Sequence, residues 1–342
     1  MMLHFESDYL EGAHPLVLER LMRTNMEQTS GYGTDVYCES AREKIRKACG
    51  VPEADVHFMV GGTQTNATMI TAMLCPYEGV IAAGSGHINQ HEAGAVEAGG
   101  HKILALPHVD GKLSAKDVDC YVSDFYANPS WDAMVVPGMV YISHPTEYGT
   151  LYTLSELQEL SNVCRRHHIP LFLDGARLGY ALVAHNTDVT LRAIASLCDV
   201  FYIGGTKVGA LFGEAVVIPH LGKIRQLPSI IKQRGVLLAK GRLLGLQFDT
   251  LFTDGLYEHI SRNAIAMADK IVAALKERGY HFLVPPQTNQ LFIILDNERL
   301  NRLSSKIGFE IWEKIDKTHT AVRIVTSWAT REECVDELIK ML

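Results

Sequence analysis

Seven short β-rich runs alternate with longer helical patterns through the first two-thirds of this chain. The runs are VHFMV (56–60), GVIAA (79–83), KILAL (102–106), MVYIS (139–143), PLFLD (170–174), VFYIG (200–204) and AVVIP (215–219). Strands that alternate with helices form βαβ crossovers, which give a mainly parallel sheet covered on both faces. The alternation therefore predicts an α/β protein with a mostly parallel central sheet flanked by helices.

One of these units can be followed closely. Thr153 and Glu156 have the T-x-x-E spacing of a capping box, and leucines at three-residue intervals keep one helical face apolar. Pro170 ends the helix before the strand LFLD begins. Asp174 is thus expected at the carboxyl end of a strand, the edge at which open α/β sheets bind ligands.

The regular alternation of strands and helices ends near residue 249. A helical stretch is followed by HFLVPP, QLFIIL, another helix, AVRIVTS and a terminal amphipathic helix. This order predicts a smaller C-terminal α/β domain. We expect an N-terminal segment at 1–16 near the active site, a large ligand-binding domain at 17–248 and the small domain at 249–342.

Composition narrows the class of protein. The 342 residues give a net charge of −7, which leaves no general excess of Lys and Arg for a phosphate backbone, so nucleic acid is not expected as a partner. The longest apolar stretch, 133–142, is too short to span a membrane. Seven scattered cysteines without a C-x-x-C pair indicate reduced thiols and a cytoplasmic location.

Three motifs resemble ligand sites but are incomplete. The run GSGHIN (84–89) lacks the third glycine of a dinucleotide fingerprint, and Lys207 in GGTK is not followed by the Ser or Thr of a P-loop. His87 and His91 could share a helical face with Glu92 nearby, but a zinc protease helix has Glu directly after its first His. No metal site is therefore expected.

The segment VGGTQTN (60–66) follows a strand and opens a helix. Glycines let a ligand approach the backbone, and exposed N–H groups with the helix dipole bind anions. The alternative is an ordinary tight turn between strand and helix. Because the motif contains no lysine, it suits the single phosphate of a cofactor better than a triphosphate.

Asp174 closes an almost wholly apolar strand, so its charge requires a positive partner. Arg177 could be that partner, and a protonated heterocyclic nitrogen is the functional alternative. Lys207 lies among glycines after another strand, where an amine can lose its proton and form a Schiff base; a solvated surface lysine is the alternative. His87 follows a strand and could lie against a cofactor ring, or be a core or surface histidine. A phosphate turn, an acid and a lysine on one sheet edge indicate pyridoxal 5'-phosphate (PLP).

Taken together, these motifs resemble the low-specificity L-threonine aldolases, within the β-eliminating lyase group of fold-type I PLP enzymes. The resemblance extends over nearly the whole chain. It rests on Ser7-Asp8, Gly12, His14-Pro15, Tyr32-Gly33-Thr34-Asp35, Gly62-Thr63-Gln64-Thr65-Asn66, His87-Ile88, Glu92-Ala93-Gly94, Thr146-Glu147-Tyr148-Gly149-Thr150, Asp174-Gly175-Ala176-Arg177, Gly205-Thr206-Lys207 and Arg323-Ile324-Val325-Thr326-Ser327.

The resemblance implies a role for each matched residue. Lys207 would carry the internal aldimine of PLP, Asp174 would face the pyridine nitrogen and His87 would stack on the ring. The phosphate turn would contain Gly62, Thr63 and Gln64, while Ser7, Arg177 and Arg323 would surround the substrate carboxylate, with Arg177 also near the cofactor. A neighbouring subunit contributes basic residues in this family; Arg242 is the nearest match here and Arg234 a weaker one, which implies a homodimer or homotetramer.

The implied reaction is retro-aldol cleavage of a β-hydroxy-α-amino acid, with L-threonine or L-allo-threonine giving glycine and acetaldehyde. His87 is the first candidate for the base and His91 the second. The main alternative is β-elimination on another amino acid, which would give pyruvate and ammonia. A cofactor-binding protein without catalysis and an NAD-dependent oxidoreductase are further alternatives, and the second rests on the incomplete fingerprint.

Overall fold

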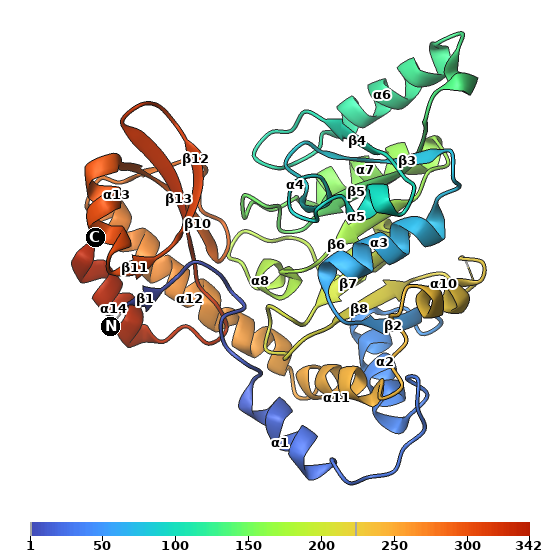
Figure 1. The fold of residues 1–342 in the computed structure, drawn as a ribbon, viewed down its shortest axis with the longest axis horizontal. Coiled ribbons are helices and arrows are strands. Elements are labelled where there is room, and N and C mark those ends of the chain that lie inside the picture. The colour runs from blue at the N-terminus through green and yellow to red at the C-terminus, as the bar shows by residue number, and fades with distance from the viewer. Residues whose placement is uncertain (1, 223) are drawn as a thin grey trace.

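The larger of two lobes in the computed structural model contains a seven-stranded sheet (Figure 1). The structure describes residues 2–222 and 224–342. The strands follow the order β2-β8-β7-β6-β5-β3-β4. Their bounds are β2 (Asp55–Met59), β3 (Glu78–Ala83), β4 (Ile103–Leu106), β5 (Val136–Ser143), β6 (Leu171–Asp174), β7 (Val200–Gly204) and β8 (Glu214–Ile218). All seven runs predicted as strands are confirmed.

The sheet is parallel from β4 through β7, and β8 runs antiparallel to both of its neighbours. Only residues 205–213 connect β7 to β8, which is too short for a helical crossover back to the opposite edge. The chain therefore turns back at the binding edge, and the short connection carries Lys207. The mainly parallel sheet is confirmed.

Helices cover both faces of this sheet, as Figure 1 shows. They are α1 (Pro15–Arg23), α2 (Val36–Cys49), α3 (Gly62–Met73), α4 (His87–Gln90), α5 (Ala95–Ala98), α6 (Ala115–Ala127), α7 (Leu154–Arg166), α8 (Leu178–Leu182), α9 (Leu191–Leu197), α10 (Leu227–Gln233) and α11 (Arg242–Leu251). Along β6, Leu171 and Leu173 enter one buried cluster and Phe172 the other. This alternation makes the strand apolar on both faces, as the sequence predicts.

The start of α7 confirms the predicted capping box. Thr153 Oγ1 accepts a hydrogen bond from the Glu156 backbone N–H at 3.2 Å, and Glu156 Oε2 accepts one from the Thr153 N–H at 2.7 Å. These contacts satisfy two N–H groups that the helix leaves unpaired at its first turn. β6 then ends at Asp174, which places that carboxylate on the carboxyl edge of the sheet.

The smaller lobe contains a four-stranded antiparallel sheet in the order β12-β13-β10-β9. Its elements are α12 (Leu256–Glu277), β9 (His281–Phe282), β10 (Gln290–Asp296), α13 (Asn297–Ser304), β12 (Glu310–Lys314), β13 (His319–Val325) and α14 (Glu332–Met341). Strand β12 was not expected. It lies at the edge of the sheet and Ile311 is 56% exposed, so this strand carries no run of buried residues that the sequence could reveal.

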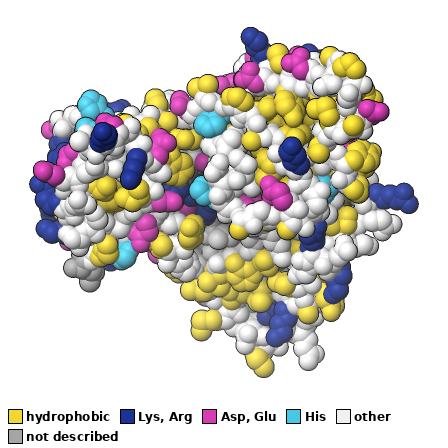
Figure 2. Space-filling model, turned by 45° about the horizontal axis from the view of Figure 1, so that its top comes forward, with side chains coloured by type: hydrophobic (Ala, Val, Ile, Leu, Met, Phe, Trp, Pro, Cys, Tyr) yellow, Lys and Arg dark blue, Asp and Glu magenta, His cyan; other side chains and the backbone are white. Residues whose placement is uncertain are grey.

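The N-terminal segment joins the smaller lobe. Strand β1 (Leu3–His4) pairs in parallel with β11 (Ile307–Gly308), and Phe5 is buried in the same core. Residues 6–9 then lead to the junction of the two lobes, where Figure 2 shows histidine, acidic and basic side chains close together. The proposed domain boundary at 248/249 falls inside α11.

In the part of the chain that the structure describes, no helix has both the length and the apolar character needed to cross a membrane. Within residues 2–222 and 224–342, no cluster of three or more His, Cys, Asp or Glu side chains is arranged to hold a metal ion. The seven cysteines carry free thiols.

Candidate active site

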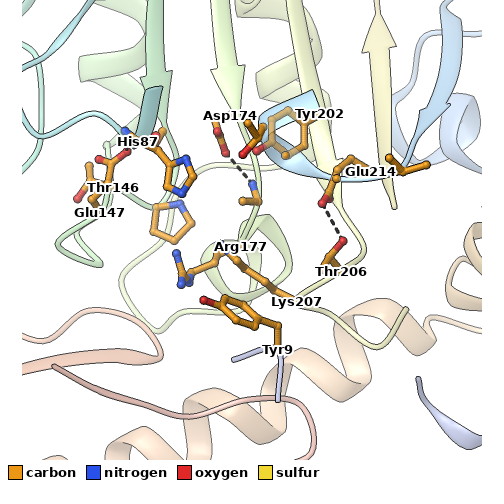
Figure 3. Close-up of a pocket in the computed structure, with 17 residues that line it drawn as sticks. Tyr9, His87, Thr146, Glu147, Asp174, Arg177, Tyr202, Thr206, Lys207 and Glu214 are labelled. Atoms are coloured by element: carbon orange, nitrogen blue, oxygen red, sulfur yellow. Dashed lines mark hydrogen bonds between the residues drawn. The ribbon is translucent and has the colours of Figure 1, made fainter. Parts of the chain in front are cut away.

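A cavity of about 330 Å3 lies at the carboxyl edge of the seven-stranded sheet (Figure 3). Loops that follow five strands of this sheet, β2, β3, β5, β6 and β7, supply most of its wall. The lining residues are Tyr9, Val60, Gly61, Gly62, Thr63, His87, Ser143, Pro145, Thr146, Glu147, Asp174, Ala176, Arg177, Tyr202, Thr206, Lys207 and Glu214. The sheet edge thus brings together Gly62, Thr63, His87, Asp174 and Lys207, as the sequence predicts.

A second cavity, of about 540 Å3, lies between the lobes; we call it the outer cavity. It shares Tyr9, His87, Glu147, Arg177 and Lys207 with the first. The rest of its wall comes from the N-terminal segment, from the α4 region and from the smaller lobe: Glu6, Ser7, Leu10, His91, Phe309, Glu310, Trp312 and Arg323. A molecule at the sheet edge is therefore directly adjacent to a site that both lobes form.

Lys207 follows β7 in the short connection to β8. Burial lowers the pKa of its amine from the ordinary value of 10.5 to about 8, and the nearby Arg177 adds to this, while Asp8, Asp174 and Glu214 oppose it. The Lys207 carbonyl accepts a hydrogen bond from Tyr180 Oη at 2.5 Å, which ties the connection to α8. A lysine with this pKa has a useful neutral fraction near pH 7, as a nucleophilic amine requires.

Asp174 is 4% exposed and accepts hydrogen bonds at both carboxylate oxygens. Tyr141 Oη and Asn66 Nδ2 donate to Oδ2 at 2.6 and 3.0 Å, and the Ala176 N–H donates to Oδ1 at 3.0 Å. Burial opposes ionisation, yet His87 and hydrogen bonds from Tyr141, Tyr202 and the Ala176 N–H hold the pKa of Asp174 below its ordinary value. Asp174 is therefore an ionised carboxylate on the cavity wall, suited to a cationic ring nitrogen.

His87 begins the short helix α4, and its ring lines both cavities. Its Nδ1 lies 2.7 Å from Glu92 Oε1, and its backbone N–H donates to Glu147 Oε1 at 2.7 Å. The ring of His91 is 5.6 Å from that of His87, and His91 lines the cavity between the lobes but not the cavity at the sheet edge. Neither Glu92 nor Glu147 was assigned a role from the sequence, because nothing local marks them as contacts of His87.

The glycine turn before α3 forms the end of the cavity next to Tyr202. Gly61 caps the helix without a side-chain hydrogen bond, so the first N–H groups of α3 are available to an anion. A Cβ at Gly62 would lie 3.1 Å from Tyr202 Oη, which shows how little room the turn leaves. Gln64 does not line the cavity; its Oε1 accepts a hydrogen bond from the Val60 N–H at 3.4 Å.

Arg177 does not pair with Asp174, although the sequence left Arg177 open as the positive partner of that carboxylate. Its Nε and Nη2 donate to the two carboxylate oxygens of Asp8 at 2.6 and 3.1 Å. Burial opposes ionisation of Asp8, yet Arg177 keeps the pKa of this carboxyl below its ordinary value. Asn289 Nδ2 also donates to Asp8, at 3.0 Å. The N-terminal segment, the large sheet and the smaller lobe thus meet at one buried ion pair.

Arg323 lies on β13 and is 9% exposed. Its Nη1 donates to Gln290 Oε1 at 2.9 Å, and its guanidinium forms an ion pair with Glu310 of β12. Trp312 packs 5.7 Å from the same guanidinium. Ser7 lines the outer cavity beside it, with a buried Oγ that has no hydrogen-bond partner among the described residues. Arg323 and Ser7 therefore come together as predicted, and Glu310 is an unexpected carboxylate beside them.

Glu214, at the start of β8, also lines the cavity and was missed from the sequence. Its carboxylate accepts hydrogen bonds from Thr206 Oγ1 at 2.9 Å and from the Gly205 N–H at 3.0 Å, the two residues that precede Lys207. Burial raises the pKa of Glu214 to about 8. Glu214 directly follows the short connection between β7 and β8, seven residues beyond Lys207, and this position is the one signal that could have identified it.

Arg242 and Arg234 lie outside both cavities of this chain. Arg242 begins α11 and donates to the carbonyls of Thr24 at 2.7 Å and Glu27 at 3.4 Å. Arg234 ends α10 and donates to Thr71 Oγ1 at 2.8 Å. Neither residue reaches the site of its own chain, so a role at an active site would require a second copy.

The residues present fit PLP. The uncapped N-terminus of α3 suits a phosphate, the ionised Asp174 suits a pyridinium nitrogen and Lys207 suits an aldehyde carbon. A mostly parallel sheet with these groups at its carboxyl edge, completed by a smaller lobe, defines the class of fold-type I PLP enzymes.

Comparison with known proteins places the chain within that class. Residues 4–298 match the model of the family described as Beta-eliminating lyase, and the chain belongs to this family. It is 26% identical over 340 residues to the low specificity L-threonine aldolase of a Pseudomonas species, covering 98% of this chain and 95% of that protein. The corresponding protein of Pseudomonas aeruginosa is also 26% identical, covering 98% and 96%.

Solved structures agree with these matches. A threonine aldolase from Leishmania major has a TM-score of 0.94 and 43% identity, covering 98% of both chains. Aspartate aminotransferase from Thermus thermophilus has a TM-score of 0.73 at 16% identity, over 99% of this chain and 90% of that one, and shares the fold. The predicted fold class and family are confirmed, and both support PLP as the cofactor.

Proposed function

We propose that this chain is a PLP-dependent aldolase that cleaves L-threonine or L-allo-threonine to glycine and acetaldehyde. The observation that carries the proposal is the placement of Lys207, Asp174 and His87 on one cavity that adjoins the Arg323 site. Similarity to threonine aldolases over nearly the whole chain supports the choice of reaction.

Lys207 is proposed to hold the cofactor as a Schiff base, since its lowered pKa makes its amine available near neutral pH. When bound, PLP supplies an electron sink for the carbanion that bond cleavage leaves on the substrate. Asp174 would keep a proton on the ring nitrogen, because its pKa is held low and an ionised carboxylate stabilises the cation. Gly62 and Thr63 would bind the phosphate through the first turn of α3.

Arg323 is proposed to bind the substrate carboxylate in a charge-assisted contact, with the unpartnered Ser7 hydroxyl beside it. The carboxylate would replace Glu310 as the ion-pair partner of Arg323. Arg177 is already held by both oxygens of Asp8, so it would contribute positive charge to the cavity without giving up that pair.

His87 is proposed to remove the proton of the β-hydroxyl group as the Cα–Cβ bond breaks. It lines both cavities, so its ring can reach a group placed between Lys207 and Arg323. His91, the second candidate, contributes to the outer cavity only, and burial lowers its pKa below the ordinary value.

We further propose a homodimer or homotetramer in which Arg242 reaches the site of a neighbouring subunit. Arg242 donates a hydrogen bond to the Thr24 carbonyl in the turn after α1. Met22, in the last turn of α1, is 79% exposed, and Met26, in the turn that follows, is 88% exposed. Hydrophobic side chains also gather on the lower part of the face in Figure 2. We also propose a division into three parts, at 1–16, 17–248 and 249–342. A cytoplasmic location is proposed as well.

The test is a coupled assay on the purified protein with PLP. Aldehyde released from L-threonine and L-allo-threonine is measured through NADH consumption by alcohol dehydrogenase, and Lys207→Ala should abolish both the release and the borohydride-fixed adduct. 2-Oxobutanoate and ammonia in place of aldehyde and glycine would contradict the proposal and favour β-elimination. A Lys207→Ala protein that forms the same adduct would contradict the lysine assignment.

A further inference from the structure

A network of polar contacts lies along one side of the cavity. Asn66 Nδ2 donates to Asp174 Oδ2 at 3.0 Å and to Glu92 Oε1 at 2.7 Å, and Glu92 Oε1 lies 2.7 Å from His87 Nδ1. Tyr141 Oη donates to Asp174, and Ser143 Oγ lies 3.3 Å from Tyr141 Oη and donates to Glu147 Oε1 at 2.6 Å. Glu147 also accepts the backbone N–H of His87, so His87 is tied to this network at two points.

The direction of these hydrogen bonds can be assigned from chemistry. Asn66 faces two carboxylates, so its amide nitrogen must point toward them, because an amide oxygen in that place would be repelled by both. Its two N–H groups are then used. When Glu92 is a carboxylate it can only accept, and His87 Nδ1 then carries the proton in the contact with Glu92 Oε1.

A proton on Nδ1 determines what the rest of the imidazole can do. In a neutral histidine the other nitrogen, Nε2, then bears a lone pair. The Glu92 side chain is fully buried, whereas the His87 side chain is 35% exposed and lines both cavities. Among the described residues, Nε2 has no hydrogen-bond partner, so this edge of the ring is left to the cavities.

We infer that Glu92 is a positioning residue, which holds His87 in its Nδ1-protonated tautomer so that Nε2 accepts a proton from the substrate. Its chemical logic is that of the buried acid in a catalytic triad, which orients a histidine base without taking the proton itself. The inference deepens the proposed function and rests on it for the identity of the substrate. Asn66 extends the arrangement by linking Glu92 to Asp174, so the acid facing the cofactor and the acid behind the base share one donor.

Other charged groups also lie around His87. They are Glu92 on the turn after α4, His91 at the end of α4, Glu147 after β5, Asp174 at the end of β6, Arg177 at the start of α8, Lys207 after β7, and Glu310 and Arg323 of the smaller lobe. Glu92 is the carboxylate that contacts the ring itself, whereas Glu147 contacts the backbone N–H of the same residue. Glu147 therefore provides a matched control.

The first measurement is the tautomer of His87 in the holoenzyme labelled with 15N-histidine, read from the 15N chemical shifts of its two ring nitrogens. The chain has 15 histidines, and the His87 signals are assigned by their loss in His87→Gln. The expected result for the neutral ring is a protonated Nδ1 and an unprotonated Nε2. The opposite tautomer in the wild-type protein would overturn the inference without any variant.

Three variants separate the roles of the neighbouring acids. Glu92→Leu removes the acceptor and should give a mixture of tautomers, with kcat lowered by about 100-fold or more and KM little changed. Glu92→Gln restores an acceptor oxygen without the charge and should recover the Nδ1-protonated tautomer and part of kcat. Glu147→Gln should leave the tautomer unchanged. A Glu92→Leu protein with the wild-type tautomer, or a Glu147→Gln protein with as mixed a population, would overturn the inference.

The spectroscopic readout needs no substrate, so it stands apart from the reaction. A wild-type protein with the expected tautomer but no aldehyde release would refute the proposed function and leave the positioning role intact. Aldehyde release with a protonated Nε2 would refute the positioning role and leave the function intact.

Discussion

The amine of Lys207 should react as a base with a pKa of about 8, well below the ordinary 10.5 of lysine. The structure assigns this shift to burial and to the neighbouring Arg177. At pH 7, a pKa of 8 leaves about 9% of the amine neutral, against about 0.03% for a pKa of 10.5. The neutral amine is the nucleophile, and its fraction at pH 7 is roughly 300-fold larger than the ordinary pKa would allow.

Replacing Asp8 with Asn should lower the pKa of Lys207 further. The Asp8 carboxylate is ionised and raises the pKa of Lys207, so its loss removes a charge that favours the protonated amine. The reactivity of Lys207 should then level off below pH 8 in the variant, and the reactive fraction at pH 7 should increase. Below the new pKa, the rate should still fall tenfold for each pH unit.

The assay is competitive labelling of the apoprotein with a trace acylating reagent between pH 6 and 11, with each labelled lysine quantified by mass spectrometry. Exposed lysines in the same sample act as internal controls for reagent decay. A Lys207 profile that rises continuously past pH 10 in the wild-type protein would refute the reasoning from burial. An Asp8→Asn profile shifted to higher pH would refute the assigned sign of the Asp8 contribution.

Three further predictions concern the supports of the site. Asp8→Asn leaves Arg177 buried without its anion and should lower the free energy of unfolding by about 3–5 kcal/mol, against at most about 1 kcal/mol for Glu258→Gln in an exposed pair; urea unfolding that gives equal losses would contradict this. Gly175→Ala places a Cβ 2.0 Å from the Tyr202 carbonyl oxygen and should cost at least about 3 kcal/mol, whereas Gly12→Ala, with open space around it, should be nearly neutral in the same assay. Glu310→Gln frees Arg323 from its partly exposed ion pair and should lower KM by up to about fivefold at similar kcat; a raised KM in steady-state kinetics would show that Glu310 assists binding.

The strands of the larger lobe could be predicted because each has a recognisable local sequence pattern. An apolar run of four to eight residues bounded by turn residues is visible in the sequence, and all seven such runs are strands. The exposed edge strand β12 has no such apolar run and was not predicted. The reversed direction of β8 follows from the shortness of segment 205–213, which the sequence contained but the alternation alone did not reveal.

Some acids and bases of the site could likewise be predicted from the sequence, and others could not. Asp174 and Lys207 were found because each directly follows a buried strand, and a parallel sheet brings such positions to one edge. Asp8, Glu310 and Glu214 were not assigned, since their importance depends on which side chain each one meets. Asp8 meets Arg177 across 169 positions of the chain.

The sequence by itself determined the α/β class, the order of the strands along the chain and the chemical groups at the sheet edge, because these depend on local pattern. The tertiary structure alone decided the partners of those groups: Asp8 with Arg177, Glu92 with His87 and Glu310 with Arg323. The reason is physical. A hydrogen bond requires two atoms within about 3 Å, and only the packing of lobes, turns and registers brings distant residues that close.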